Sequence, residues 1–237
     1  MSQSGWDWPV EGFVVRKKRA QHVGVPLLRS SLLLGVALIV ASSLTGCTSE
    51  EDLLRNATCE GKALTSREDG RKVVGLVPDG VYELTSRYSE YDSRSSRAFC
   101  LIREREGEER KVIVLKAWFG TSGTEPSQLS LRELDQSGAV DGRKARITSK
   151  SPRVGGVSGE ADAALSAPCT LPESESDSPL DMRRGTLHVT ASSDNAPDPD
   201  SPEQRQNAAD LTLSFLRHAV QRCDDPPELP AKVHIEK

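Results

Sequence analysis

The stretch that decides the fold is SPEQRQNAADLTLSFLRHAVQRC, residues 201–223 near the end of the chain. Ser201 is a typical N-cap residue, Pro202 fits the first helical position, and Gln204 stands at capping-box spacing from the cap. The sequence therefore predicts a helix from about Pro202 to Cys223. Apolar residues recur along it at helical intervals: Ala208, Ala209, Leu211, Leu213, Phe215, Leu216, Ala219, Val220 and Cys223.

The opposite side of this helix is polar, with Asp210, Ser214, Arg217 and Gln221. A broad apolar face opposed by polar residues is typical of a helix that packs against a core. Cys223 falls within the apolar face, so we expect its thiol to point toward a buried partner.

Segments before this helix have the composition of strands, which are rich in Val, Ile, Thr, Tyr and Phe. Strands are predicted at residues 81–88, 98–105, 111–119, 145–149, 161–167 and 186–192. The third of these carries apolar residues on both faces, so we expect both faces to be partly covered. A second helix is predicted at about Leu64 to Val77, although Gly70 and Gly75 disfavour it, and a short helical piece at Leu129–Leu134.

The N-terminal segment resembles a secretory signal. Five basic residues, four of them at Arg16-Lys17-Lys18-Arg19, precede an apolar run of thirteen residues, Leu32 to Leu44. As a helix this run is about 20 Å long, too short to cross the ~30 Å hydrocarbon core of a bilayer. The segment is therefore expected to be a signal peptide. The alternative is an uncleaved signal anchor.

The run ends at Leu44-Thr45-Gly46-Cys47, which resembles the lipobox of bacterial lipoproteins. The resemblance implies transfer of diacylglycerol to the Cys47 thiol and cleavage before this residue. Each buried CH₂ of the acyl chains contributes ~0.8 kcal/mol to anchoring. We therefore expect a protein of the cell membrane, lipid-anchored on the extracytoplasmic face.

Export would place the remaining cysteines in an oxidising compartment. Once Cys47 carries lipid, Cys59, Cys100, Cys169 and Cys223 remain, and four cysteines permit three connectivities. If each half of the chain is cross-linked internally, the pairs are Cys59–Cys100 and Cys169–Cys223, which is the pairing we favour. Each loop closure would stabilise the fold by about 4 kcal/mol in the chain-entropy model.

These elements predict an α+β fold, with antiparallel strands in one or two small sheets, two packed helices and two disulfides. In the first half the helix precedes the strands, and in the second it follows them. The predicted divisions are a signal peptide at residues 1–46, a lipidated tether at 47–58, α+β halves at 59–137 and 138–225, and a flexible tail at 226–237.

The charge balance argues against nucleic acid as a partner. Residues 1–46 hold five of the 31 basic residues and two of the 35 acidic ones, so the chain from Cys47 onward carries a net charge of −7. Phosphate binding requires an excess of clustered Lys and Arg. The membrane contact is therefore expected to come from the lipid anchor.

Residues that could carry chemistry are few. His188, His218 and His234 have no metal-ligand spacing, and no phosphate or dinucleotide motif is present, so no metal or cofactor is expected. We interpret His188 as a strand histidine at a sheet surface. Gly156-Val157-Ser158-Gly159 and Gly120-Thr121-Ser122-Gly123 lack the spacing of a nucleophile elbow.

Two charged segments are interpreted as solvated. Asp194, Asp198, Asp200 and Glu203 could hold Ca²⁺, but two prolines interrupt them and no ligand-loop glycine is present. Arg103-Glu104-Arg105-Glu106 has the mixed charge of an exposed hairpin end.

Three functional hypotheses remain open at this point. The first is a non-catalytic envelope module that binds an envelope protein or a small apolar ligand. The second is an envelope hydrolase with a site built from loops, which would need a nucleophile and base in one pocket. The third is a structural or assembly factor of the envelope.

Four features together resemble a group of actinobacterial lipoproteins of unknown function. They are the lipobox, a helix that follows Cys59, the sequence Ala167-Pro168-Cys169 and the helix Ala208–Cys223. The resemblance spans most of residues 47–223. It supports the location and the disulfides, and it implies no catalytic residues.

The lipobox leads to a direct prediction about the N-terminus. Mass spectrometry of protein extracted from its native membrane should show an acylated Cys47 as the first residue. A Cys47→Ala variant should keep residues 1–46, because the resemblance implies that the lipoprotein signal peptidase cleaves only after lipid has been transferred to this cysteine. An intact segment 1–46 in the wild-type mature protein would contradict the prediction.

Overall fold

A computed structural model describes most of the chain after residue 53 and one short segment near the N-terminus. The described residues are 13–17, 54–55, 59, 63–78, 80–89, 97–104, 111–120, 144–150, 154–173 and 183–236. At residues 13–17, 80–89, 97–99, 103–104 and 111, only the path of the strand is described. Cys47 and the helical piece predicted at Leu129–Leu134 lie outside the described residues.

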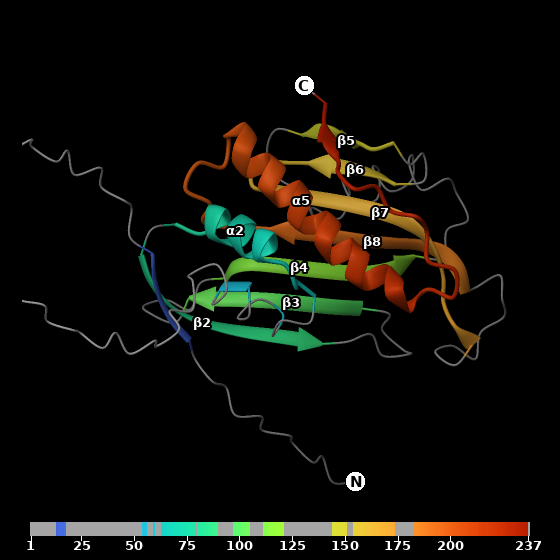
Figure 1. The fold of residues 1–237 in the computed structure, drawn as a ribbon, viewed down its shortest axis with the longest axis horizontal. Coiled ribbons are helices and arrows are strands. Elements are labelled where there is room, and N and C mark those ends of the chain that lie inside the picture. The colour runs from blue at the N-terminus through green and yellow to red at the C-terminus, as the bar shows by residue number, and fades with distance from the viewer. Residues whose placement is uncertain are drawn as a thin grey trace, which may run out of the picture.

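The strands are β1 Phe13–Lys17, β2 Gly80–Ser89, β3 Arg97–Glu104, β4 Lys111–Gly120, β5 Ala145–Thr148, β6 Gly155–Ser158, β7 Asp162–Thr170, β8 Arg184–Ser192 and β9 His234–Ile235. They form one antiparallel sheet of nine strands, in the order β1-β2-β3-β4-β8-β7-β6-β5-β9 (Figure 1). The first four strands make one meander and the next four make a second. Their last strands, β4 and β8, pair with each other at the centre.

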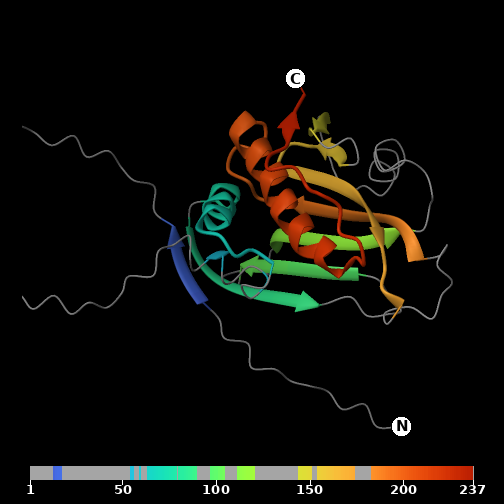
Figure 2. The same cartoon turned by 45° about the vertical axis from the view of Figure 1, so that its right-hand side comes forward.

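Helix α5, Pro202–Ala219, begins where the sequence predicts and continues as a 3₁₀ turn at Val220–Arg222. Ser201 Oγ accepts a hydrogen bond from Gln204 N at 3.2 Å, as an N-cap residue does. All nine residues of the predicted apolar face are buried. The helix lies mainly across β7 and β8 (Figures 1 and 2).

Helix α2, Arg67–Leu76, begins later than predicted because Ser66 caps it and forms a capping box with Asp69. At the other end of α2, Ser193 Oγ donates a hydrogen bond to Leu76 O at 2.7 Å. Gly75 lies where α2 packs on α5, since a β-carbon there would be 2.7 Å from Asn207 Nδ2. The glycine that weakens the helix prediction therefore allows the two helices to approach closely.

The core lies between the two helices and the sheet face that they cover (Figure 2). Each fully buried aliphatic side chain there contributes roughly 1.5–3 kcal/mol relative to exposure. The strands contribute these residues in alternation: Cys100, Ile102, Ile113, Leu115, Ala117, Ile147, Ala163, Leu165, Ala167, Leu187, Val189 and Ala191.

The central strands are also buried on the face away from the helices. In β8, Thr186, His188 and Thr190 alternate with core residues and are 4%, 1% and 4% exposed. Ser166 of β7 is 0% exposed on the same face. In β4, Val114 and Trp118 are half-buried on this face. Both faces of β4 are thus partly covered, as predicted.

The two disulfides pair Cys59 with Cys100 and Cys169 with Cys223, as predicted. The first fastens the segment before α2 to β3. The second fastens the end of α5 to β7. The predicted α+β class, with two helices and two disulfides, is therefore confirmed, and the strands of the two predicted halves share one sheet.

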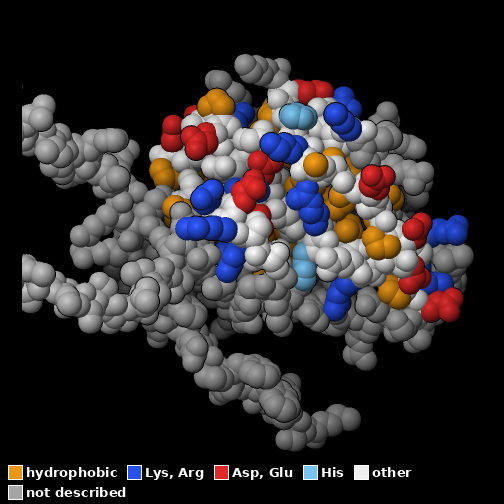
Figure 3. All heavy atoms as spheres, in the orientation of Figure 1, with side chains coloured by type: hydrophobic (Ala, Val, Ile, Leu, Met, Phe, Trp, Pro, Cys, Tyr) orange, Lys and Arg blue, Asp and Glu red, His pale blue; other side chains and the backbone are white. Residues whose placement is uncertain are grey.

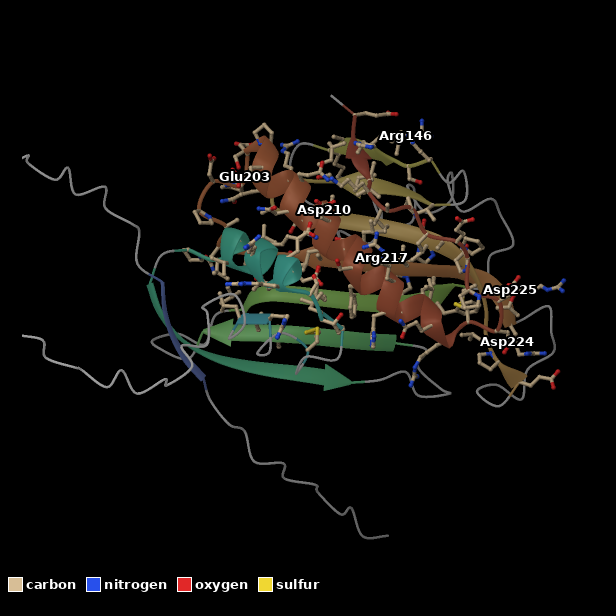
Figure 4. All side chains as sticks on the ribbon, viewed as in Figure 1. Arg146, Glu203, Asp210, Arg217, Asp224 and Asp225 are labelled. Atoms are coloured by element: carbon tan, nitrogen blue, oxygen red, sulfur yellow. A yellow bond between two sulfur atoms is a disulfide. The ribbon has the colours of Figure 1, made fainter. Side chains whose placement is uncertain are left out.

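The C-terminal residues are held against the body, so the prediction of a flexible tail at 226–237 is wrong for residues 226–236. Arg217 Nη2 donates hydrogen bonds to Pro230 O and Ala231 O, at 2.8 and 2.9 Å (Figure 4). Val233 is 1% exposed, and β9 pairs with β5. A two-residue strand has no periodicity from which sequence analysis could find it.

The sequence patterns also do not predict β1 and β6. Strand β1 lies within the predicted signal peptide and pairs with β2 over five residues, from Phe13 opposite Leu84 to Lys17 opposite Gly80. Strand β6 has the sequence Gly-Gly-Val-Ser, which is typical of a loop. Its Gly156 is needed in the sheet, because a β-carbon there would overlap the carbonyl oxygen of Ala164.

The central pair of strands depends on a close backbone approach at Gly185. A β-carbon at this position would overlap Gly120 O and lie 2.8 Å from Phe119 Cζ. Backbone atoms in a sheet cannot move aside without breaking their own pairing. The β4–β8 contact therefore tolerates no side chain at residue 185.

We expect Gly185→Ala to lower the free energy of unfolding by about 2–3 kcal/mol, because the added methyl group forces β4 and β8 apart. The matched variant Gly75→Ala should stay within about 1 kcal/mol of wild type. There the obstacle is the end of the Asn207 side chain, which can rotate, and alanine favours the helix. Urea unfolding of the oxidised wild-type protein and of both variants measures these free energies. A Gly185→Ala variant as stable as wild type would contradict the close approach of β4 to residue 185.

Candidate functional site

The best candidate site is a row of three side chains on the sheet face away from the helices. Trp118 of β4, His188 of β8 and Ser166 of β7 occupy directly opposed positions on adjacent strands. Strand alternation puts all three on the same face, because Ala117, Val189 and Leu165 beside them point into the helix-covered core. The row brings a histidine and a hydroxyl group together at the centre of the sheet.

The imidazole of His188 is held by contact with its neighbours in β4. It stacks on the Trp118 ring, with centroids 5.4 Å apart and an angle of 26° between the planes. Gly120 leaves room for it, since a β-carbon at that residue would lie 3.3 Å from His188 Nε2. His188 is 1% exposed. The interpretation of His188 as a residue at the sheet surface is therefore wrong.

Burial lowers the pKa of His188 from 6.5 to about 4. The cause is desolvation, which disfavours the charged imidazolium. The ring is thus neutral near pH 7. A general base works best with a pKa near the operating pH, so this histidine is poorly matched to proton abstraction. Ser166 Oγ donates a hydrogen bond to Gly155 O at 3.4 Å, which ties this hydroxyl to β6.

A second polar cluster joins the two helices. The buried carboxylate of Asp69 accepts hydrogen bonds from Ser66 Oγ and Ser214 Oγ, both at 2.6 Å. Lys72 Nζ lies 3.6 Å from the same carboxylate. Ser214 belongs to the predicted polar face of α5, so this face is partly used to fix α2. A carboxylate with these partners is satisfied within the fold.

A third cluster surrounds Arg183, which is only 5% exposed. Its Nη1 donates to Leu171 O and its Nη2 to Glu173 Oε1, both at 2.9 Å. Asp224 lies 3.6 Å from the guanidinium, and its backbone N–H donates to Thr170 O. These contacts join the start of β8, the end of β7 and the residue after Cys223, beside the Cys169–Cys223 disulfide.

The candidate calcium ligands lie on the exposed loop before α5. Asp194, Asp198, Asp200 and Glu203 all have exposed side chains, and Glu203 lies at the start of the helix (Figure 4). Asp200 lies 3.5 Å from Arg205. Among the residues that the structure describes, no group of three His, Cys, Asp or Glu side chains is arranged to hold a metal ion.

The remaining candidate residues are dispersed. Ser158 is 0% exposed, and its Oγ donates to Gly159 O at 3.2 Å, so it does not present a nucleophile. His218 is half-buried on α5, and His234 is exposed on β9. Residues 121–123 of the other glycine–serine segment lie outside the described residues, as do Cys47 and the Arg105-Glu106 pair.

The sequence patterns do not identify Trp118, Asp69 and Arg183 as partners in these clusters. The alternation of side chains along a strand shows only that Trp118 lies on one face of its strand and His188 on one face of its own. It does not reveal that β4 pairs with β8, which are more than 60 residues apart in the chain. Strand register between distant segments is set by packing and has no local signature.

No protein-family model, curated protein or solved structure matches this chain. Within the described part of the chain, neither helix has both the length and the apolar character needed to span a bilayer.

The low pKa of His188 predicts a pH-dependent stability. Between pH 6.5 and about 4 the unfolded chain binds a proton that the folded protein does not. The free energy of unfolding should therefore fall as the pH falls through this window, by about 3 kcal/mol in total.

The variant His188→Phe keeps an aromatic ring beside Trp118 but cannot bind a proton. The part of the pH dependence of unfolding that comes from His188 should therefore be absent from this variant. Urea unfolding of both proteins at about pH 7 and about pH 4 measures the effect, since the carboxylates common to both cancel in the comparison. The same pH dependence in both proteins would contradict the assignment.

Proposed function

We propose that this chain is a lipid-anchored extracytoplasmic lipoprotein whose folded body is a non-catalytic binding or interaction module. The observation that carries the proposal is the position of the lipobox. Cys47 stands seven residues before Leu54, which is 0% exposed and part of the core. Seven extended residues span at most about 25 Å, so the lipid would hold the body close to the membrane surface.

The two disulfides support an extracytoplasmic location. Cys59–Cys100 and Cys169–Cys223 use all four of the cysteines that follow Cys47. Such bonds persist in oxidising compartments and are rare in the cytoplasm. Lipidation of Cys47 would leave no free thiol in the mature chain.

The use of the chemically active groups supports binding over catalysis. Ser158 and Ser166 bond to backbone carbonyls, Ser214 to Asp69, and His188 is buried and neutral near pH 7. Acyl transfer needs a nucleophile and a base within hydrogen-bond reach of each other and of a substrate. In the described residues these groups instead stabilise the fold.

The surface charge supports a protein or small-molecule partner over nucleic acid. Acidic and basic side chains are mixed over the face that carries the helices (Figure 3). The chain after Cys47 carries a net charge of −7. Phosphate backbones are bound by clustered positive charge. The resemblance to actinobacterial lipoproteins agrees with this proposal and adds no activity to it.

The proposal predicts specific capture from the native membrane. The lipidated protein, crosslinked in intact cells and purified under denaturing conditions, should recover the same envelope protein repeatedly, or a bound apolar molecule in the lipid extract. A double Cys169→Ala, Cys223→Ala variant should lose this capture, because the end of α5 is released from β7.

Enzyme assays provide the opposing outcome. The purified protein should not turn over esterase, peptidase or glycosidase substrates. Turnover that His188→Ala abolishes would replace the proposal by a histidine-dependent hydrolase. Turnover that survives this substitution would indicate a site built on carboxylates.

A further inference from the structure

Strand β2 becomes an edge strand if β1 is removed. In the structure β1 covers one side of β2, and β1 belongs to the predicted signal peptide. The basic region of a signal peptide stays on the cytoplasmic side during export, so β1 and β2 of an exported chain would lie on opposite sides of the membrane. The other edge of the sheet is covered by β9, which pairs with β5.

An uncovered β2 edge would be a template for pairing with another strand. A sheet edge presents unpaired N–H and C=O groups, and proteins protect such edges with proline, charged side chains (lysine above all), bulges or short strands. The sequence of β2, GVYELTSRYS, has ten residues with no proline and no lysine. Its pairing with β3 runs over six residues without a register shift. The pairing with β1 shows that this edge accepts an antiparallel strand.

The sequence of β2 is complementary to itself in the antiparallel direction. If two copies pair about Thr85, Glu83 of each strand stands opposite Arg87 of the other. Tyr82 stands opposite Tyr88 in the same register. Opposite charges and aromatic pairs across strands are both favourable. The two-fold symmetry of such a dimer doubles each of these pairs.

We propose that the mature chain forms a homodimer in which β2 of one copy pairs antiparallel with β2 of the other, centred on Thr85. The two sheets then continue into one, with the β2 edge of each copy covered. This inference rests on the proposed function, because it requires cleavage before Cys47 and loss of β1.

The test uses the lipidated protein in its native membrane. Two copies with different C-terminal tags are expressed together, crosslinked, extracted in detergent and captured through one tag. The second tag should be recovered with the first, and the crosslinked species should have twice the mass of the mature chain. Absence of the second tag would overturn the proposal.

Charge exchange locates the interface. Glu83→Lys places lysine opposite arginine twice, and Arg87→Glu places glutamate opposite glutamate twice, so each variant should reduce capture of its own copy roughly tenfold. A Glu83→Lys copy expressed with an Arg87→Glu copy should restore capture, because both pairs become attractive again. Restoration also shows that both variants fold.

The control Glu228→Lys makes the same charge change at an exposed residue after α5 and should leave capture unchanged. Capture that the β2 variants do not alter would overturn the proposal. Mass spectrometry of the captured chain distinguishes failure of the proposed lipoprotein from failure of the proposed dimer. An intact residue 1–46 segment would contradict the proposed lipoprotein, whereas an acylated Cys47 on a chain that does not pair would contradict the dimer alone.

Discussion

The pairing of β4 with β8 is the contact on which the rest of the structure depends. Each is the last strand of its meander, and seven residue pairs join them, from Val114 with Ser192 to Gly120 with Thr186. The contact requires glycine at residue 185, because a β-carbon there would overlap the carbonyl oxygen of Gly120 in β4. Helix α5 lies mainly over β7 and β8 of the second meander and also contacts β4 of the first, so it packs across the β4–β8 junction.

One disulfide lies on each side of the β4–β8 pair, and the two make equivalent connections. Each fastens a neighbouring segment to the third strand of a meander, at Cys100 in β3 and at Cys169 in β7. The segments are the chain before α2 and the end of α5. The Cys169–Cys223 disulfide therefore fixes the chain just after α5, the Cys59–Cys100 disulfide fixes the segment that leads to α2, and the Asp69–Ser214 hydrogen bond joins the two helices. Among the residues whose burial is described, Phe215 is the largest that is fully buried and the core is otherwise mostly aliphatic, so these links add to its stability.

The parts of this fold that sequence analysis predicts are those with a local signature. Helix α5 has a capping serine, a proline at its first position and a 3.6-residue apolar repeat. The strands from β2 to β5, β7 and β8 have enough β-branched, aromatic or aliphatic residues to be recognised as strands. Strand β6, Gly-Gly-Val-Ser, lacks this composition, because Gly156 is required by its contact with Ala164. The burial of His188 and the attachment of residues 226–236 arise from pairing between distant segments, which no local pattern encodes.

The two edges of the sheet differ, and the difference bears on how the anchored protein would meet its surroundings. At one edge, β9 covers β5, and Arg217 and Gln206 hold the chain that leads to it. At the other, β1 covers β2 in the structure. If the proposed cleavage removes β1, β2 becomes the edge, and its neighbour β3 is bonded to Cys59, twelve residues after the proposed lipid site. The proposed tether from Cys47 to Leu54, at most about 25 Å long, would hold the body close to the membrane surface. Such confinement would raise the effective concentration of neighbouring copies, so that backbone pairing too weak to persist in solution would become significant at the membrane surface.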